Sequence, residues 1–409
     1  MTLSQDDLSP GSRVFIISEF VDKSRNSTGY YWHKIIIGLS KERAGINVIS
    51  TAVSCSLVEK SSHPATYIPV GGIRSYKKNG LFSRALGQMM LSFLFVKSIV
   101  RHVKKGDIVF SGTNPAFMLL FISILRPLMG FRWALLVHDI FPENLLPAKV
   151  VSRRSPVYPV LKYVFDRAYS RADSLIAIGR DMQELLIKKT GASSKIEYVP
   201  NWADLNDVTL EKTSPSIYFS SEKHDRVVFQ FFGNIGRVQG IEFILQAISK
   251  MKSKKAAFLF IGGGAAESVV TDFIALNPDV DIAHVPSLLF EKNNEGLSAC
   301  DVAIIPLAPG MLGLGVPSKA YFSMAADKPI LVIGDQGAEL QLLLNENADV
   351  GWFCQSGNAD ALALIIDQIC SIDLVSMIKK PRALIAERYN YPSAIERYAY
   401  VLRNLKNDG

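Results

Sequence analysis

Short apolar runs that alternate with helical patterns recur along this chain and restrict its fold more than any other feature. In the first half they cover residues 14–17, 47–50, 107–110, 133–137 and 174–178. Near-continuous apolar strands of four to six residues, each followed by a helix, are typical of a parallel sheet covered on both faces. The first half is therefore predicted to form an α/β domain with a doubly wound sheet.

A second series of the same kind begins at residue 227, after a polar stretch at 206–225 that reads as a linker. Its apolar runs cover residues 227–232, 257–261, 282–285, 302–305 and 330–333. The 409 residues also exceed what one ordinary core organises, which favours two domains. We predict two Rossmann-like, doubly wound domains, residues 1–200 and 201–387, that face each other across a cleft.

The composition indicates a globular chain in a reducing compartment. Apolar residues make up 48% and charged residues 20%, so disorder is not expected. The four cysteines are widely spaced, which predicts buried thiols rather than a metal site or a disulfide. No secretory signal is visible, and the apolar stretch 117–137 is broken by Arg126, Pro127 and Arg132. We expect a cytoplasmic protein in which this stretch forms a buried helix and a buried strand.

The net charge of +7 is divided unevenly between the two halves. Residues 1–200 carry 27 Lys and Arg against 14 Asp and Glu, a net of +13, and residues 201–409 carry 18 against 24, a net of −6. A basic half suggests a membrane surface, a phosphorylated acceptor or nucleic acid as partner. No nucleic-acid-binding motif is present, so a membrane or a lipid phosphate is preferred, and a merely solvated basic surface is the alternative.

Two glycine-containing loops of the second half are the best candidates for an anion site. Each lies between an apolar strand and a helix, where free backbone N–H groups and the helix dipole favour a phosphate. The candidate residues are Gly233, Asn234, Gly236 and Arg237 in the first loop and Pro317, Ser318 and Lys319 in the second. A lysine at the start of a helix opposes the dipole, which an anionic ligand explains better than helix stability does. The alternatives are a plain tight turn and a surface lysine.

Three further segments carry polar groups at the expected ends of strands. Glu339, at another helix start, either accepts bonds from ribose hydroxyls or favours the helix N-terminus. The cleft-facing position of the first domain holds Thr28, Gly29 and Tyr30, and the run 137–144 holds His138, Asp139 and Glu143. These last three are candidates for proton transfer or for holding acceptor hydroxyls, with a structural role as the alternative.

Together these segments resemble glycosyltransferase family 4, which has the GT-B fold. The tract VPSK at 316–319, with MAA at 324–326 and PIL at 329–331, is similar to the VPSK…YMAAGRPI of bacterial surface-polysaccharide transferases. GNIG at 233–236 is similar to their GNMG, and PNWAD at 200–204 is similar to the family's PNGVD, which places Asn201 at the cleft. Residues 388–409 resemble the terminal helix that crosses back onto the first domain.

The resemblance implies a retaining transfer from a UDP- or GDP-sugar to a lipid-diphosphate-linked oligosaccharide, without a metal or other cofactor. The acceptor would be of the undecaprenyl-diphosphate type, and the enzyme would bind peripherally to the anionic inner membrane. Two other hypotheses stay open: a nucleotide-sugar 2-epimerase of the same fold, and a non-catalytic subunit of a polysaccharide assembly complex.

The sequence also departs from the family pattern. Leu314 and Phe322 stand where many members carry two glutamates, and Asn234 and Gln239 stand where an arginine and a lysine often hold the diphosphate. Asp327 replaces a usual glycine. Arg237 and Lys319 are then the cations expected to replace the missing charge. These departures favour the polysaccharide subgroup over the sucrose- and glycogen-synthesising enzymes.

Overall fold

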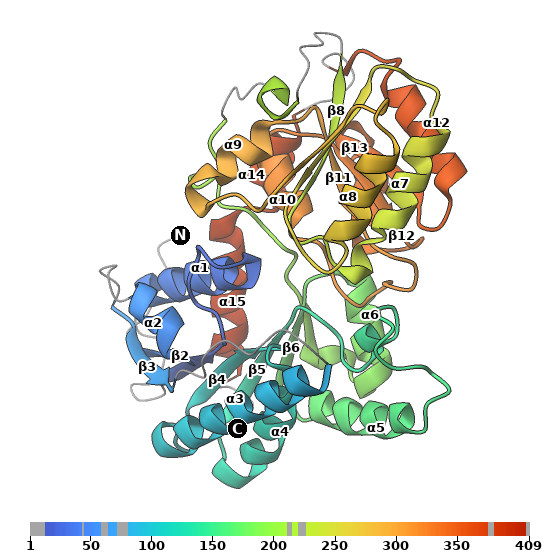
Figure 1. Cartoon of the computed structure of the whole chain (residues 1–409). Helices are drawn as coiled ribbons and strands as arrows, with labels where there is room; N and C mark the ends of the chain where they lie inside the picture. The colour runs from blue at the N-terminus through green and yellow to red at the C-terminus, as the bar shows by residue number, and fades with distance from the viewer. Residues whose placement is uncertain are drawn as a thin grey trace.

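The computed structural model describes residues 13–42, 45–58, 64–71, 81–210, 215–219, 226–374 and 380–405. It contains a seven-stranded sheet of order β3-β2-β1-β4-β5-β6-β7 and a six-stranded sheet of order β10-β9-β8-β11-β12-β13. Figure 1 shows the two sheets in two separate α/β domains, one above the other. The predicted fold class, two Rossmann-like α/β domains, is confirmed.

The central strands of each sheet are buried on both faces, as their apolar runs predict. The first sheet consists of β1 (Val14–Ile17), β2 (Ile46–Thr51), β3 (Thr66–Val70), β4 (Ile108–Gly112), β5 (Arg132–Val137), β6 (Ser174–Ala177) and β7 (Ile196–Tyr198). The second consists of β8 (Val227–Phe232), β9 (Ala256–Ile261), β10 (Ile282–Val285), β11 (Val302–Pro306), β12 (Ile330–Gly334) and β13 (Gly351–Gln355). Sequence analysis missed β3, β7 and β13, which lie at sheet edges and are less fully buried.

The direction of the crossovers determines which face of the first sheet each helix covers. These helices are α1 (Ser27–Glu42), α2 (Ala52–Val58), α3 (Leu81–His102), α4 (Ala116–Met129), α5 (Val157–Ser170) and α6 (Arg180–Thr190). The strand order proceeds one way from β1 to β3 and the other way from β4 to β7. Right-handed crossovers therefore put α1 and α2 on one face of the sheet and α3 to α6 on the other.

The second domain has shorter helices around its sheet. They are α7 (Ile241–Lys250), α8 (Glu267–Leu276), α9 (Asn293–Ser298), α10 (Lys319–Ala325), α11 (Glu339–Glu346), α12 (Ala359–Ile369) and α14 (Pro381–Arg388). The predicted linker falls partly on residues 211–214 and 220–225, which lie outside the described residues. All four cysteines are buried free thiols, as predicted.

The last helix, α15 (Tyr391–Asn404), belongs to the core of the first sheet. Its residues Ile395, Tyr398 and Leu402 are buried in the same hydrophobic cluster as β1, β4 and β5. It packs against α1, where Gly38 lets the two helices approach: a Cβ on Gly38 would lie 2.6–2.8 Å from the Ile395 side chain. Figure 1 shows this helix beside α1, although the two stand at opposite ends of the chain.

The chain passes between the two cores at two neighbouring places. Trp202 is buried in the first core and Ala203 in the second. The Ala203 backbone N–H donates to the Tyr389 carbonyl oxygen at 3.0 Å, and Ala203 forms a parallel bridge with Asn390. The outward and return crossings are therefore bonded to each other. The exact domain limits at 200 and 387 stay a prediction.

The close approach at Gly38 gives a stability test. Gly38→Ala is expected to destabilise the protein by about 1–3 kcal/mol, because the added methyl overlaps the Ile395 side chain. Ile395→Ala alone should cost about 2–5 kcal/mol, since it empties a buried site. The double variant should cost less than the sum of the two, because the smaller residue at 395 makes room for the methyl. Chemical denaturation of all four proteins measures this coupling, and strictly additive effects would contradict the described packing.

Candidate active site at the domain interface

Two of the loops predicted to hold phosphate meet at Lys319. This residue is the first of α10, and its Nζ donates a hydrogen bond to Gln239 Oε1 at 3.1 Å. The same atom lies 3.9 Å from the centroid of the Phe231 ring. A Cβ built on Gly233 would lie 3.8 Å from Nζ. The structure thus brings the loop at 313–319 and the loop after β8 to one point.

The Lys319 charge has no counter-ion within the described part of the chain. Its one polar contact among the described residues is the neutral Gln239 amide, and burial in the surrounding protein lowers its pKa to about 7. A cation held among an amide and an aromatic ring lacks the solvation it has in water. An anionic ligand at this place would restore that stabilisation, which is the arrangement expected of a phosphate site.

Glycines let the neighbouring loops fold tightly against each other. Gly233 has φ of 131° and Gly262 has φ of 139°, both values that favour glycine. A Cβ on Gly262 would lie 1.9 Å from the Gly233 carbonyl oxygen. Sequence analysis missed the glycines at 262–264, although they too follow an apolar strand. A side chain at Gly262 would collide with the loop at Gly233, which approaches Lys319.

The other residues predicted in these loops are exposed or partly buried. Asn234 and Arg237 are exposed, and Gly236 is partly buried between them. Arg237 begins a 3-10 turn, Arg237–Gln239, that leads into α7. Pro317 and Ser318, directly before α10, are partly buried. Because Arg237 is exposed to solvent, its guanidinium group is accessible to a ligand.

Asp139 approaches the same loop from the first domain. A Cβ on Gly315 would lie 3.7 Å from Asp139 Oδ1 and 3.5 Å from the His138 carbonyl oxygen. The Ile140 backbone N–H donates to the Leu314 carbonyl oxygen at 3.3 Å. The Asp139 carboxylate is exposed, but nearby protein still desolvates it enough to raise its pKa to about 6. Asp139 is therefore a carboxylate at neutral pH with a pKa suited to proton transfer.

His138 supports this turn as a neutral group. Its Nε2 is buried and has no hydrogen-bond partner among the described residues. Its ring lies 6.4 Å from that of Tyr31 and 6.5 Å from that of Trp32. Burial lowers the pKa of His138 to about 4, so the ring stays neutral at physiological pH. The backbone N–H groups of His138 and Asp139 both donate to Thr113 Oγ1 at 3.3 Å, which fixes the turn.

Glu143 is held away from proton transfer by two lysines. Its carboxylate accepts bonds of 2.7 Å at both oxygens from Lys189 Nζ and one of 3.2 Å from Lys162 Nζ. Asp166 completes the network, and the Lys189 side chain is 1% exposed. Protonating Glu143 would remove part of the negative charge that balances the buried Lys189 ammonium group. The geometry therefore indicates a structural role for Glu143 in place of the predicted role in proton transfer.

The predicted cleft position at 28–30 contacts the second domain through Tyr30. The ring of Tyr30 lies 5.2 Å from that of Phe322 in α10, and its hydroxyl donates to Asp207 Oδ2 at 2.9 Å. Thr28 is partly buried. Gly29 is required for packing, because a Cβ there would lie 2.2 Å from the Asp22 carbonyl oxygen. The segment thus positions Tyr30 against the helix that begins at Lys319.

Glu339 joins the two domains. It is 1% exposed, and it accepts bonds from Arg180 Nε and Nη2 at 3.0 Å each, from the Arg180 backbone N–H at 2.6 Å and from the Tyr198 hydroxyl at 2.7 Å. These four bonds use its accepting capacity. The predicted ribose contact of Glu339 therefore finds no free oxygen in this arrangement. We call this set of Arg180, Tyr198 and Glu339 the interdomain latch.

A second set of contacts holds the loop at 313–316 to the first domain. Asn201 Nδ2 donates to the Val316 carbonyl oxygen at 3.0 Å, and the Gly313 N–H donates to Asp181 Oδ2 at 2.9 Å. Gly313 has φ of 72°, and a Cβ there would lie 2.9 Å from the Asp181 carbonyl oxygen. Sequence analysis identified Asn201 but missed Asp181 and Arg180. Their signal was present, since they open a helix directly after the apolar run 174–178.

Known families match both halves of this arrangement. The model for Glycosyltransferase Family 4 matches residues 31–207, and the model for Glycosyl transferases group 1 matches residues 226–371. The chain is 41% identical over 404 residues to the probable glycosyltransferase WbjE of Pseudomonas aeruginosa, which covers 97% of this chain and 99% of the relative. The chain belongs to glycosyltransferase family 4. The resemblance read from its motifs is confirmed.

Two further comparisons extend this result. The transferase is 22% identical over 292 residues to the putative colanic acid biosynthesis glycosyl transferase WcaI of Escherichia coli strain K12, covering 69% of this chain and 70% of the relative. The crystal structure of Anabaena HepE in complex with UDP-glucose has a TM-score of 0.70 at 14% identity, covering 96% of this chain and 100% of that one. The predicted GT-B fold is confirmed.

The departures of this transferase from the family pattern have physical explanations. Leu314 is buried at the interface, and Phe322 packs against Tyr30, so both positions form domain contacts. Gln239 holds Lys319. Asp327 has φ of 58°, a left-handed conformation that favours glycine, and its Oδ1 accepts a bond from the backbone at the start of α14.

Two structural findings bear on the expectations about the membrane and metals. Within the described ranges, no helix of the transferase has the length and apolar character needed to span a bilayer. Nor do three or more His, Cys, Asp or Glu side chains gather as a metal site in those ranges. The expectation of a metal-free reaction stays a prediction.

The unpaired Lys319 predicts that donor binding is linked to proton uptake. Below its pKa of about 7 the amine is charged and attracts a diphosphate, and above that pH it loses its proton and the attraction. Affinity for a nucleoside diphosphate should therefore fall as pH rises from about 6.5 to 8.5. Titration calorimetry in buffers of different ionisation enthalpy should show proton uptake. Lys319→Met should bind weakly and lose this uptake, and an unchanged proton count would contradict the placement of the phosphate.

The interdomain latch predicts a coupled loss of stability. Arg180→Ala should destabilise the protein by about 3 kcal/mol, because it leaves the buried Glu339 carboxylate without its cation. Adding Glu339→Gln should restore part of that loss, since the variant no longer buries a charge. Arg153→Ala, an exposed arginine of the same domain, is the control and should have little effect. Thermal denaturation measures all four, and equal effects of Arg180→Ala and the control would rule out the latch.

Proposed function

We propose that this transferase moves a sugar from a UDP- or GDP-sugar to a lipid-diphosphate-linked oligosaccharide during synthesis of a bacterial surface polysaccharide. The observation that carries the proposal is the unpaired Lys319 amine, which joins the two predicted phosphate loops across from Asp139. Such a cation stabilises a donor diphosphate, and a nearby carboxylate can accept the proton of an acceptor hydroxyl.

Relatives and structural neighbours support the two substrates separately. The similar HepE structure contains UDP-glucose, which supports a nucleotide-sugar donor. The similarity to WbjE and to a putative colanic acid biosynthesis transferase supports an oligosaccharide acceptor in a polysaccharide pathway. An undecaprenyl-diphosphate-type carrier is the proposed lipid, because the amino-terminal half has a net charge of +13 and suits an anionic membrane acceptor.

The proposed reaction breaks the bond between the anomeric carbon and the donor diphosphate. Lys319, with Arg237 and the backbone N–H groups of both glycine loops, would stabilise the negative charge that develops on the leaving nucleotide. These groups stand in for a metal ion, so we propose that no metal is needed. The acceptor hydroxyl forms the new bond to the anomeric carbon on the face from which the diphosphate departs, and its proton passes to the Asp139 carboxylate.

We also propose that the anomeric configuration is retained and that the enzyme acts at the cytoplasmic face of the inner membrane. Retention is supported by membership of family 4 alone. The neutral His138 takes no part in proton transfer in this scheme, and it supports the turn that presents Asp139. The competing hypotheses of a 2-epimerase and a non-catalytic subunit draw no support from the relatives, which are transferases by name.

The test supplies membranes bearing lipid-linked acceptors with radiolabelled UDP- and GDP-sugars. Transfer should require one of these donors, and Lys319→Ala should lower kcat/KM by about 10²–10³-fold, as expected for loss of one charged group at the leaving diphosphate. Asp139→Asn should lower kcat by about 10²–10⁴-fold and remove the rise in rate through pH 6.

The controls for this assay are drawn from the same chain. Lys252→Ala removes an exposed lysine of the second domain and should leave activity unchanged. Full activity of Lys319→Ala would refute the phosphate role. Epimerisation of a UDP-sugar in the absence of any acceptor would instead establish the 2-epimerase.

A further inference from the structure

The loop that joins β11 to α10 is hydrogen-bonded to the first domain, although both elements belong to the second. Three of its backbone groups bond to first-domain residues: the Gly313 N–H to Asp181 Oδ2 at 2.9 Å, the Leu314 carbonyl oxygen to the Ile140 N–H at 3.3 Å, and the Val316 carbonyl oxygen to Asn201 Nδ2 at 3.0 Å. The first domain therefore fixes the path of the backbone at 313–316.

The same loop is also packed into the core of the first domain. Met311 and Leu314 are 6% and 5% exposed, and both belong to the hydrophobic cluster of the first sheet. The residues on either side of the loop, Ile305 in β11 and Tyr321 in α10, are buried in the cluster of the second sheet. The loop thus begins and ends in one domain and is buried in the other.

Two glycines allow this close contact. A Cβ on Gly179, which precedes α6, would lie 2.8 Å from Val316 Cγ2. A Cβ on Gly313 would lie 2.9 Å from the Asp181 carbonyl oxygen. A side chain at either position would push the loop and the start of α6 apart. The loop therefore has little freedom to shift while the two domains are in contact.

The second domain anchors the beginning of the loop through Asp335, which directly follows β12. The backbone N–H groups of Gly310 and Leu312 donate to Asp335 Oδ2 at 2.8 and 3.1 Å. The two anchors divide the loop between the domains. Its own domain holds residues 310–312, and the first domain holds residues 313–316.

The part held by the first domain leads directly to Lys319. This residue begins α10 three positions after Val316. The loop is bonded to the first turn of the helix, because the Tyr321 N–H donates to the Ser318 carbonyl oxygen at 3.0 Å. The Lys319 amine has one polar contact among the described residues, with Gln239. The path of the loop backbone therefore decides where the amine lies.

We propose that Asn201 and Asp181 are positioning residues of the first domain that set the affinity of the second domain for the donor diphosphate. They hold the loop at 313–316 and act through the location of the Lys319 amine. The inference rests on the proposed function for the role of Lys319, and it adds two residues from the other domain. A phosphate site held in this way is complete only while the domains are in contact.

A double-mutant cycle on UDP binding tests the proposal. Asn201→Ala should weaken the binding of UDP about tenfold, since the loss of one buried hydrogen bond has an effect of this order. In the Lys319→Met background the same change should weaken binding less than about twofold, because the amine that Asn201 positions is gone. Asp181→Asn keeps the size of the side chain but loses one acceptor, and it should show the same dependence on Lys319. Titration calorimetry measures each affinity.

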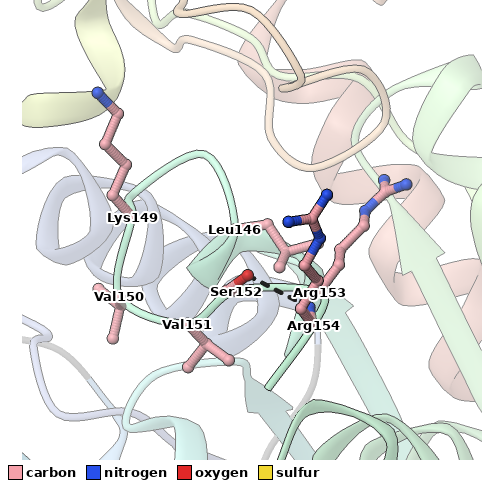
Figure 2. A pocket seen from close by; sticks show the side chains of 7 residues that line it. All are labelled: Leu146, Lys149, Val150, Val151, Ser152, Arg153 and Arg154. Atoms are coloured by element: carbon pink, nitrogen blue, oxygen red, sulfur yellow. Dashed lines mark hydrogen bonds between the residues drawn. The ribbon is translucent and has the colours of Figure 1, made fainter.

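The control for this cycle is a cation of the first domain that lies in a surface hollow. Residues of the segment 146–154 line this hollow of about 500 Å³, and Figure 2 shows Arg154 among them. Arg154 is exposed, so solvent and salt screen its charge. Arg154→Ala should leave the affinity for UDP within about twofold of its starting value in both backgrounds.

The outcomes separate this inference from the proposed function. An equal loss of affinity from Asn201→Ala in both backgrounds would mean that Asn201 acts only on the fold, and it would overturn the inference. Unchanged binding in both Asn201→Ala and Asp181→Asn would do the same. Full binding of UDP by Lys319→Met would instead refute the phosphate role itself, and the inference with it. Thermal denaturation verifies that each variant folds, and if Asn201→Ala does not, the cycle with Asp181→Asn decides.

Discussion

The direction of the strands is the constraint on which the rest of this structure depends. Every paired strand in both sheets runs parallel to its neighbours, so each sheet gathers its loops at one edge. The two domains meet at these edges, where Asp139 follows β5, Arg180 follows β6, and Lys319 begins α10 after β11. Groups from distant parts of the sequence therefore converge without any one segment holding a complete site.

Some charged groups at and near the domain interface form ion pairs, and others do not. Arg180 and Glu339 satisfy each other across the two domains, and lysines surround Glu143 within the first. Lys319 and Asp139, by contrast, have no partner of opposite charge within the described residues. Paired charges stabilise one arrangement of the domains, whereas unpaired charges reduce stability and suit a ligand that brings its own charge.

The fold and the phosphate loops were predictable because apolar runs and glycines act locally. The different surroundings of Asp139 and Glu143 could not be predicted, because the lysine that binds Glu143 lies 46 residues away in sequence. A glutamate at the start of a helix is explained by the helix dipole alone, so the sequence near Glu339 does not reveal that its partners, Arg180 and Tyr198, lie in the other domain. The positive φ of Asp327 is likewise not evident from its residue type, and only the glycine usual at this position in the family points to it. Patterns locate the loops, but the partners of each side chain depend on tertiary contacts.

The packing of α15 has a consequence for the order in which the protein forms. Its buried residues, from Ala394 to Leu405, complete the core of the sheet that the ribosome makes first. Domains generally fold in the order of their synthesis, yet this one lacks part of its core until the whole second domain has emerged. Until α15 has been synthesised, the surface of α1 around Gly38 lacks the Ile395 side chain that packs on it. The amino-terminal half of the enzyme is therefore the first to be synthesised and the last to be finished.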